Sequence, residues 1–132
     1  MFLNCTAHEL TPEQREQALQ YSDTIVDLKE INPSLHERLI SCPPDKVELL
    51  TLALELLDFI PKAAKQSNMR LTLHLPVGSP AFMAIFFIHL DREKLHWRIV
   101  FSHSDRVSVD EKQADGSILK RALFKFVKFI EI

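Results

Sequence analysis

Cysteine is scarce in this chain, and its scarcity excludes several kinds of protein. The 132 residues contain only Cys5 and Cys42, with no CxxC pair and no Cys/His spacing typical of a zinc site. Two thiols are too few for a disulfide framework, and no signal peptide is recognisable, so we expect a cytoplasmic protein with reduced cysteines. The GxSxG motif of serine hydrolases is also missing. The sequence predicts neither a bound metal nor a cofactor.

Glycine is equally scarce, since Gly78 and Gly116 are the only two. We expect each of them to occupy a backbone position that other residues adopt with difficulty. Gly116 follows Asp115, and Asp-Gly is a strong signal for the turn of a β-hairpin. Gly78 precedes Ser79-Pro80, which predicts a tight turn that leads into a helix.

The chain also lacks a strong net charge and a long apolar run. Its formal net charge of -2 gives no basic field for double-stranded nucleic acid, although a local pocket can still be positive and hold a small phosphate-bearing ligand. The most apolar run, residues 81–90, is too short to cross a bilayer as a helix, so we expect no membrane partner. A hydrophobic fraction of 46% predicts one globular domain spanning residues 1–132.

Strand-like and helical segments alternate along most of the chain. The predicted strands are residues 1–6, 24–28, 71–75 and 97–101, with helical segments between them. From residue 106 the pattern changes to a hairpin that turns at Asp115-Gly116 and returns as a long strand to the last residue. This order predicts a three-layer α/β domain with a mainly parallel sheet and an antiparallel extension.

Two helices have clear sequence signals. One begins after Thr11, where Pro12 and Gln14 complete a capping box, and is expected to end near Tyr21. The leucine-rich segment 45–67 is predicted to be an amphipathic surface helix. Its expected polar face consists of Glu48, Thr51, Glu55 and Asp58, and its expected apolar face of Val47, Leu50, Leu54 and Leu57.

The apolar run 81–90 allows two interpretations. Its Phe and Ile content suits a strand, whereas Ser79-Pro80 is a typical helix start, and we favour the helix. A helix that is apolar on every side must be covered on every side. Pairing with a second copy would achieve this, so the run predicts a homodimer that forms through residues 81–90.

Polar residues follow three of the predicted strands, where ligands of open α/β sheets bind. The first group is Thr6 and His8, and the second is Gly78 and Ser79. The third group, expected in a loop after residue 101, consists of Ser102, His103, Ser104 and Arg106. Hydroxyl groups, a helix N-terminus and one arginine together favour a phosphate ligand.

Each member of this constellation also has an ordinary structural explanation. His8 could cap the first helix or lie in solvent, and Arg106 could be an exposed charge at the start of a strand or a partner of Asp105. The serines are common strand-exit residues. His74 lies in an apolar strand and is expected to be structural.

Taken together, the sequence resembles the small CRISPR-associated proteins of type III systems. The opening segment 2–14 has the strand-His-x-Leu-Thr-x-x-Gln pattern of that family, with His8 as its histidine. The segments 42–45, 104–111, 115–117 and 124–129 are similar to the middle and the end of the family. The likeness therefore covers nearly the whole chain.

This resemblance implies a Rossmann-like fold related to the CRISPR-associated sensor domains, and a homodimer that binds cyclic oligoadenylate across its two-fold axis. It also implies a ring nuclease that opens cyclic tetra-adenylate without metal and so switches off the second-messenger signal. By position, His8, Gly78, Ser104 and Arg106 match the family's functional residues. The chain departs from the family pattern at Ser79, Phe126 and Lys128, where an acidic residue, a histidine and an arginine are expected.

The residues and the resemblance both favour a ligand that is a ring of phosphates. We expect Arg106 to contact the scissile phosphate, with Ser102, Ser104 and the backbone of Gly78 in support, and His8 to act as general acid or base. An alternative is a sensor or sponge that binds the ring without cleaving it. A third is an α/β domain that binds a protein partner through residues 81–90.

Overall fold

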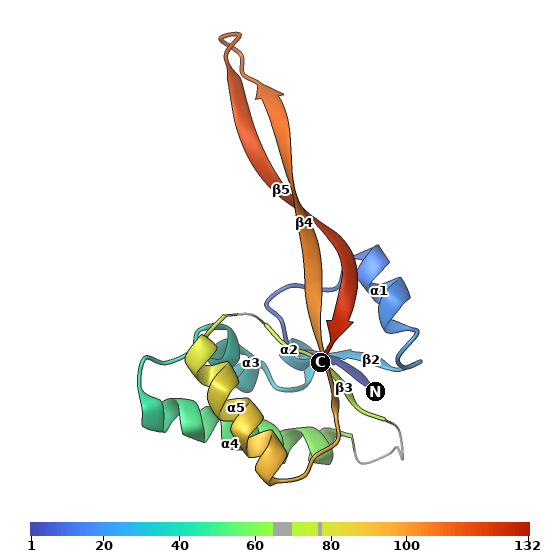
Figure 1. Ribbon diagram of the computed structural model, residues 1–132, viewed down its shortest axis with the longest axis vertical. Coiled ribbons are helices and arrows are strands. Elements are labelled where there is room, and N and C mark those ends of the chain that lie inside the picture. The colour runs from blue at the N-terminus through green and yellow to red at the C-terminus, as the bar shows by residue number, and fades with distance from the viewer. Residues whose placement is uncertain (65–69, 77) are drawn as a thin grey trace.

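The computed structural model describes residues 1–64, 70–76 and 78–132, and it has a five-stranded sheet with helices on both faces (Figure 1). The helices are α1 (Pro12–Ala18), α2 (Leu28–Ile31), α3 (Pro33–Ile40), α4 (Lys46–Ala63) and α5 (Pro80–Arg92). The strands are β1 (Phe2–Asn4), β2 (Ile25–Asp27), β3 (Thr72–His74), β4 (Arg98–Lys112) and β5 (Ile118–Glu131). The predicted α/β order is confirmed.

The sheet has the strand order β2-β1-β3-β4-β5. The first four strands run parallel, with Leu3 opposite both Val26 and Leu73, and β5 runs antiparallel to β4. Buried parallel strands read as continuous apolar runs because both of their faces are covered. Phe2 and Leu3, which point to opposite faces, are accordingly both inaccessible to solvent.

Two apolar cores lie on the two faces of this sheet. The larger core joins α3, α4 and α5 to one face through Leu3, Leu73 and Ile99, and the smaller core packs Ala18 of α1 against the other face. Rings gather in the smaller core, where the Phe2 and Phe129 centroids are 5.3 Å apart. The domain therefore has three layers, as the sequence predicts.

The helix starts predicted from sequence are confirmed. The Thr11 hydroxyl accepts a hydrogen bond from the Gln14 backbone N–H, and the Gln14 Oε1 accepts one from the Thr11 backbone N–H, which completes the capping box. The helix is shorter than expected, however, since α1 ends at Ala18 and not near Tyr21.

The apolar face predicted for α4 is wrong at Val47 and Leu54 but confirmed at Leu57, which is 6% exposed, and its polar face is confirmed as solvent-facing. Val47 and Leu54 are 69% and 43% exposed. The buried stripe instead consists of Leu49, Leu52, Ala53, Leu56, Leu57 and Ile60. The segment is so rich in leucine that two apolar stripes satisfy the helical period, and packing against α5 selects one of them. Residues 65–67 of the predicted helix lie outside the described residues.

The run 81–90 is helical, as favoured from its start signal. It forms α5, with Ser79 as N-cap accepting a hydrogen bond from the Phe82 N–H at 3.2 Å. Phe82 and Phe86 are buried against the rest of the domain, whereas Ile88 is 51% exposed. One chain therefore covers only part of this apolar helix.

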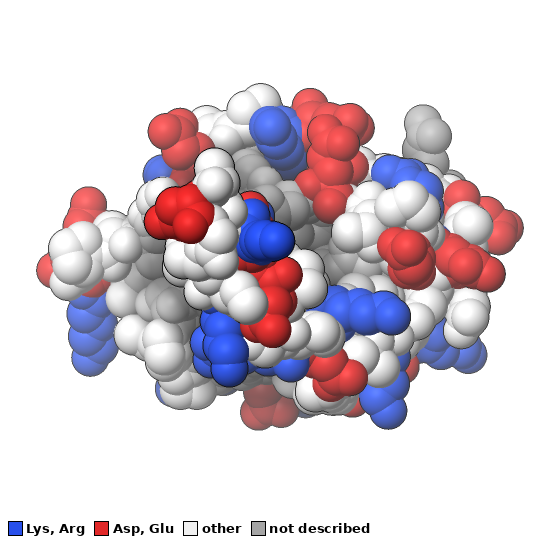
Figure 2. Space-filling model, turned by 90° about the horizontal axis from the view of Figure 1, so that it is seen from above, with Lys and Arg blue, Asp and Glu red and all other residues white. Residues whose placement is uncertain are grey.

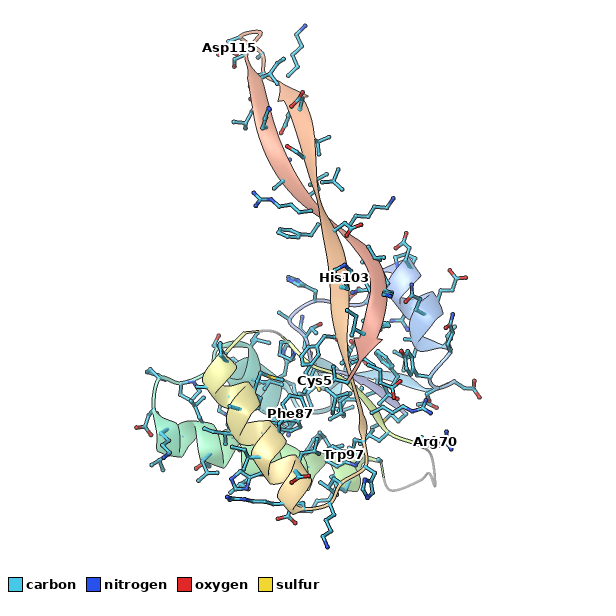
Figure 3. The ribbon with its side chains drawn as sticks, in the orientation of Figure 1. Cys5, Arg70, Phe87, Trp97, His103 and Asp115 are labelled. Atoms are coloured by element: carbon cyan, nitrogen blue, oxygen red, sulfur yellow. The ribbon has the colours of Figure 1, made fainter. Side chains whose placement is uncertain are left out.

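The largest difference from the predicted fold is the length of β4. Residues 102–106 do not form a loop but continue the strand, which runs unbroken from Arg98 to Lys112 and pairs with β5 along its length. Its outer half and that of β5 leave the body as a two-stranded ribbon, the projecting hairpin, formed by residues 104–126 (Figures 1 and 3). Figure 3 shows His103 where the ribbon leaves the body and Asp115 at its tip.

Candidate functional site at the carboxyl edge of the sheet

The strand order places a topological switch point between β1 and β3. The chain leaves β1 into α1 on one face of the sheet, and it leaves β3 into α5 on the other face. Loops diverge at such a point and leave a crevice beyond the carboxyl ends of the two strands. The sequence-predicted groups after β1 (Thr6, His8) and after β3 (Gly78, Ser79) both lie at this edge.

The loop after β1 is held by Asn4, the last residue of that strand. The Asn4 side-chain amide donates hydrogen bonds to the His8 carbonyl oxygen at 2.9 Å and to Asp27 Oδ1 at 2.7 Å. Its carbonyl oxygen accepts from the backbone N–H and the hydroxyl of Thr6 at 3.2 and 2.8 Å. The Thr6 hydroxyl thus serves to shape the loop, and the backbone of His8 is fixed while its imidazole is exposed.

A chain of hydrogen bonds continues from Asn4 across the sheet to β4. His74 Nδ1 lies 3.0 Å from Asn4 Oδ1, and His74 Nε2 lies 2.8 Å from the Ser102 hydroxyl, which in turn accepts a bond from the Gln14 amide at 3.0 Å. Since Asn4 Oδ1 only accepts, His74 carries its proton on Nδ1 and accepts from Ser102 on Nε2. We call Asn4, Thr6, Gln14, His74 and Ser102 the carboxyl-edge network.

His74 is 3% exposed, and burial lowers its pKa to about 4. The imidazole is therefore neutral at pH 7, which agrees with its acceptor role toward Ser102. The structural role predicted for His74 is confirmed. Ser102 is half-buried and is occupied on both sides by His74 and Gln14, so it connects α1 to the sheet.

The remaining members of the third predicted group do not lie in this network. His103 is on the opposite face of β4 from Ser102, with Nε2 3.6 Å from Asp105 Oδ1. Ser104 and Arg106 lie further along the strand, opposite Phe126 and Phe124 of β5. At the usual rise of about 3.3 Å per residue, Arg106 lies about 13 Å beyond Ser102. The prediction that Arg106 opens a strand after a loop is wrong, since it lies in the middle of β4.

Gly78 and Ser79 border an open apolar hollow of about 610 Å³ beside the start of α5. Pro80, Met83, Phe87 and Phe101 complete its lining. Gly78 does not have a positive φ, and a Cβ added to it would meet nothing within 4 Å. The expectation that this glycine is required by its backbone conformation is therefore wrong, whereas Gly116, with a φ of 86°, confirms it.

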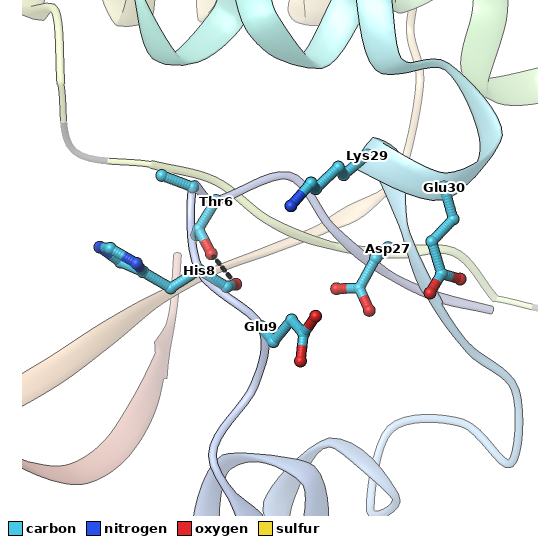
Figure 4. Close-up of a pocket in the computed structure, with 7 residues that line it drawn as sticks. Thr6, His8, Glu9, Asp27, Lys29 and Glu30 are labelled. Atoms are coloured by element: carbon cyan, nitrogen blue, oxygen red, sulfur yellow. Dashed lines mark hydrogen bonds between the residues drawn. The ribbon is translucent and has the colours of Figure 1, made fainter.

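A small second hollow lies beyond β1 and β2 (Figure 4). Glu9, Asp27 and Glu30 turn toward it together with Lys29, while the His8 imidazole points away from the carboxylates. Three carboxylates against one ammonium group disfavour a phosphate there. Charges of both signs are also interspersed over the face in Figure 2, with no broad basic field.

Residues 1–64, 70–76 and 78–132 contain neither a metal site nor a membrane-spanning helix. No group of three or more His, Cys, Asp or Glu side chains in these residues could hold a metal ion. None of the helices in this part of the chain is both long and apolar enough to cross a membrane. Cys5 is fully buried, and burial raises the pKa of its thiol, so it is a core residue.

The fold is that of an α/β protein with a mainly parallel five-stranded sheet and a projecting hairpin, and it is compatible with a Rossmann-like fold. A family model described as "Uncharacterized protein MJ1673 family" matches residues 1–130, and the chain belongs to that family. No curated protein and no solved structure matches the chain.

Sequence reasoning missed Asn4 and Gln14 as parts of the edge. Asn4 carries a signal, because an amide in the apolar run Phe2–Cys5 must find hydrogen-bond partners once it is buried. Gln14 was recognised only for its capping box, and that same bond to Thr11 orients its amide nitrogen toward Ser102.

Proposed function

We propose that this protein is a dimeric, metal-independent ring nuclease of type III CRISPR systems, with a fold related to the cyclic-oligoadenylate sensor domains. It binds cyclic oligoadenylate, with cyclic tetra-adenylate as the expected ring, and linearises it. The observation that carries the proposal is that two predicted groups, Thr6 with His8 and Gly78 with Ser79, follow the neighbouring parallel strands β1 and β3 and so lie at the same edge of the sheet. The resemblance of the sequence to that family supplies the identity of the ligand.

Although Thr6 and His8 also line the acidic hollow beyond β1 and β2, the edge offers groups that suit a ring of phosphates at the start of α5. The Ser79 cap and the backbone of Gly78 stand at the N-terminus of α5, where helix dipole and free N–H groups favour an anion. Thr6 and Ser102 shape the floor through the carboxyl-edge network, and the exposed His8 imidazole is free to take or give a proton.

Arg106 and Ser104 contact the ligand from the projecting hairpin, which extends from the carboxyl edge of the sheet. Arg106 has no ion pair within residues 1–64, 70–76 and 78–132, so its guanidinium is available to a phosphate. The step is an in-line attack of a ribose 2′-hydroxyl on the adjacent phosphorus, which breaks the bond to the 5′-oxygen and leaves a cyclic phosphate. Such a step needs orientation and stabilisation of the phosphate charge. His103 lies at the base of the hairpin, beside Asp105.

The dimer forms through α5. Ile88 is 51% exposed, and the apolar hollow beside Met83 and Phe87 continues the same surface. A two-fold axis at this helix supplies each loop and each hairpin twice, which suits a ligand that is itself two-fold symmetric.

The test is to incubate the purified protein with cyclic tetra-adenylate in the presence of a chelator and to resolve the products. We expect linear products with wild-type protein, and a rate lower by about 100-fold for Arg106→Ala, the typical loss of one charge-stabilising group. Arg121→Ala is the matched control, because Arg121 lies on the opposite face of the hairpin, paired with Glu111. Intact substrate after long incubation with excess wild-type protein would refute the proposal.

A binding module without turnover is the second candidate, and one observation favours it. His74 and Ser102 are both engaged in hydrogen bonds of the carboxyl-edge network, so neither is free to assist cleavage. The exposed imidazole of the loop after β1 is that of His8. Heat of binding in calorimetry with no product after prolonged incubation would select this candidate.

A further inference from the structure

The two faces of the projecting hairpin differ in chemistry. Residues directly opposite each other on paired strands share a face, and the faces alternate along each strand. The first face, here called the Phe124 face, carries Ser104/Phe126, Arg106/Phe124, Ser108/Ala122, Asp110/Lys120 and Lys112/Ile118. The second face, here called the Leu123 face, carries Asp105/Lys125, Val107/Leu123, Val109/Arg121 and Glu111/Leu119.

The charges of the Leu123 face are balanced in number, and Lys125 is its one cation without an ion pair among the residues that the structure describes. It has two carboxylates and two cations, Arg121 lies 3.6 Å from Glu111, and Asp105 lies 3.6 Å from His103. Its four remaining side chains are aliphatic. A neutral aliphatic surface of this kind has no preference for a polyanion.

The Phe124 face has an excess of unpaired positive charge. Its charged residues are Arg106, Lys112 and Lys120 against Asp110, and none of the three cations has an ion pair among the residues that the structure describes. The cations lie in three of the five residue pairs of this face, so they follow the length of the ribbon rather than meeting at one point. This distribution suits a linear series of phosphates.

An aromatic ring stands in the middle of these cations. Phe124 is 74% exposed, which no other large hydrophobic side chain exceeds in the described part of the chain. It lies directly opposite Arg106, and the next pair outward is the small Ser108 and Ala122. A flat ring with a guanidinium beside it and little bulk on one side is open to a stacking base.

We propose that the Phe124 face binds single-stranded oligoadenylate, with one adenine stacked on Phe124 and neighbouring phosphates on Arg106 and Lys120. The proposal deepens the proposed function and rests on it for the choice of adenylate, because it names the part of the protein that holds bases outside the crevice. An apolar protein surface is less suited to this face, since the cations of the face would remain without acceptors. Such a partner would favour the neutral Leu123 face.

The test uses the full chain and a fluorescently labelled linear oligoadenylate whose 2′-hydroxyls are methylated, so that cleavage cannot occur. Phe124→Ala should weaken binding about tenfold in fluorescence anisotropy, since one stacked base contributes about 1–3 kcal/mol. Phe124→Trp should bind at least as tightly as wild type. Leu123→Ala is the matched control on the other face of the same strand, and we expect no change.

The salt dependence of the binding constant measures the phosphate contacts of the cations separately from any effect of a substitution on folding. The slope of log K against log salt should decrease by about 0.7 for Lys120→Gln, the value for one phosphate contact to a single strand. Lys125→Gln, on the Leu123 face opposite Asp105, should leave the slope unchanged.

Three outcomes would overturn the proposal: equal losses for Phe124→Ala and Leu123→Ala, no binding of oligoadenylate by wild type, or a dimer that dissociates on Phe124→Ala while binding persists. The last would assign the face to self-association. Face-specific binding without cleavage of cyclic tetra-adenylate would support this inference and refute the ring nuclease, whereas cleavage by a protein that does not bind the linear oligoadenylate would do the reverse.

Discussion

The inner and outer halves of β4 belong to one strand but to two different environments. Residues 98–102 lie between β3 and β5, and there Val100 is buried in the smaller core and Ser102 is bonded on two sides. Residues 104–112 have β5 as their strand partner and are almost all exposed. The same backbone thus serves as core and as free ribbon.

The two halves differ in whether their polar side chains are hydrogen-bonded within the protein. A buried polar group costs free energy unless it is paired, and each described member of the carboxyl-edge network is paired. The hairpin pays no such penalty, because water reaches both of its faces, and a two-stranded ribbon by itself is only marginally stable. The inner half of β4 is therefore held rigidly by hydrogen bonds, whereas the outer half has unpaired polar groups that can bind a ligand.

The largest effect on stability is expected from Asn4→Ala. Removal of the amide leaves the His74 Nδ1–H and the Thr6 N–H without an acceptor, and it leaves a void at a residue that is 2% exposed. We expect the free energy of unfolding to fall by about 3 kcal/mol in denaturant titrations. Leu123→Ala on the hairpin should change it by no more than about 0.5 kcal/mol. Equal decreases in the free energy of unfolding for the two variants would show that the two regions contribute equally to the stability of the fold.

Acidification should weaken the inner region next. The pKa of His74 lies near 4 in the folded protein and near 6.5 when unfolded, so between these values only the unfolded chain binds the proton. Stability from this group is complete above pH 6.5 and is lost as the pH falls toward 4, by about 2 kcal/mol from pH 7 to pH 5.

His74→Gln isolates this contribution from that of other groups. The variant should lose less stability between pH 7 and pH 5 than wild type does, in thermal or denaturant unfolding. An unchanged slope in His74→Gln would show that the imidazole is not held neutral by burial.

The inner region was predictable because its signals are local. Capping residues at Thr11 and Ser79 fixed two helix starts, and continuous apolar runs indicated the buried strands. The carboxyl-edge network was not, because hydrogen bonds from Asn4 to His74 and from Gln14 to Ser102 join residues 70 and 88 positions apart. No local pattern reports such pairing.

The outer region was mispredicted for a physical reason. The polar run Ser102 to Arg106 has the composition of a loop, yet a strand needs no apolar residues where both of its faces meet water. Pairing with β5 holds it extended, and the bulge between His103 and Ser104 accommodates the change from core to ribbon. The Asp115-Gly116 turn fixed the hairpin but not its length.

A smaller effect is expected at the hairpin turn. Gly116 has a φ of 86°, which an alanine adopts at a cost of about 1 kcal/mol. If the ribbon opens independently of the body, Gly116→Ala should lower the opening free energy of amides in residues 104–126 by this amount in hydrogen exchange, while amides of β1 and β3 keep theirs. A matching decrease in β1 and β3 would show one cooperative unit instead of two regions.

The smallest effect is expected at Gly78, which tests the same substitution at the carboxyl edge. Its φ is not positive and a Cβ there meets nothing within 4 Å, so Gly78→Ala should raise the free energy of unfolding by about 0.5 kcal/mol through the unfolded chain. The open space around this position is also where the proposed ligand would approach the backbone. Cleavage of cyclic tetra-adenylate should therefore show a higher KM in a protein that is slightly more stable. A destabilised Gly78→Ala variant would mean that the glycine is required by the fold, and the sequence-based expectation for this position would be restored.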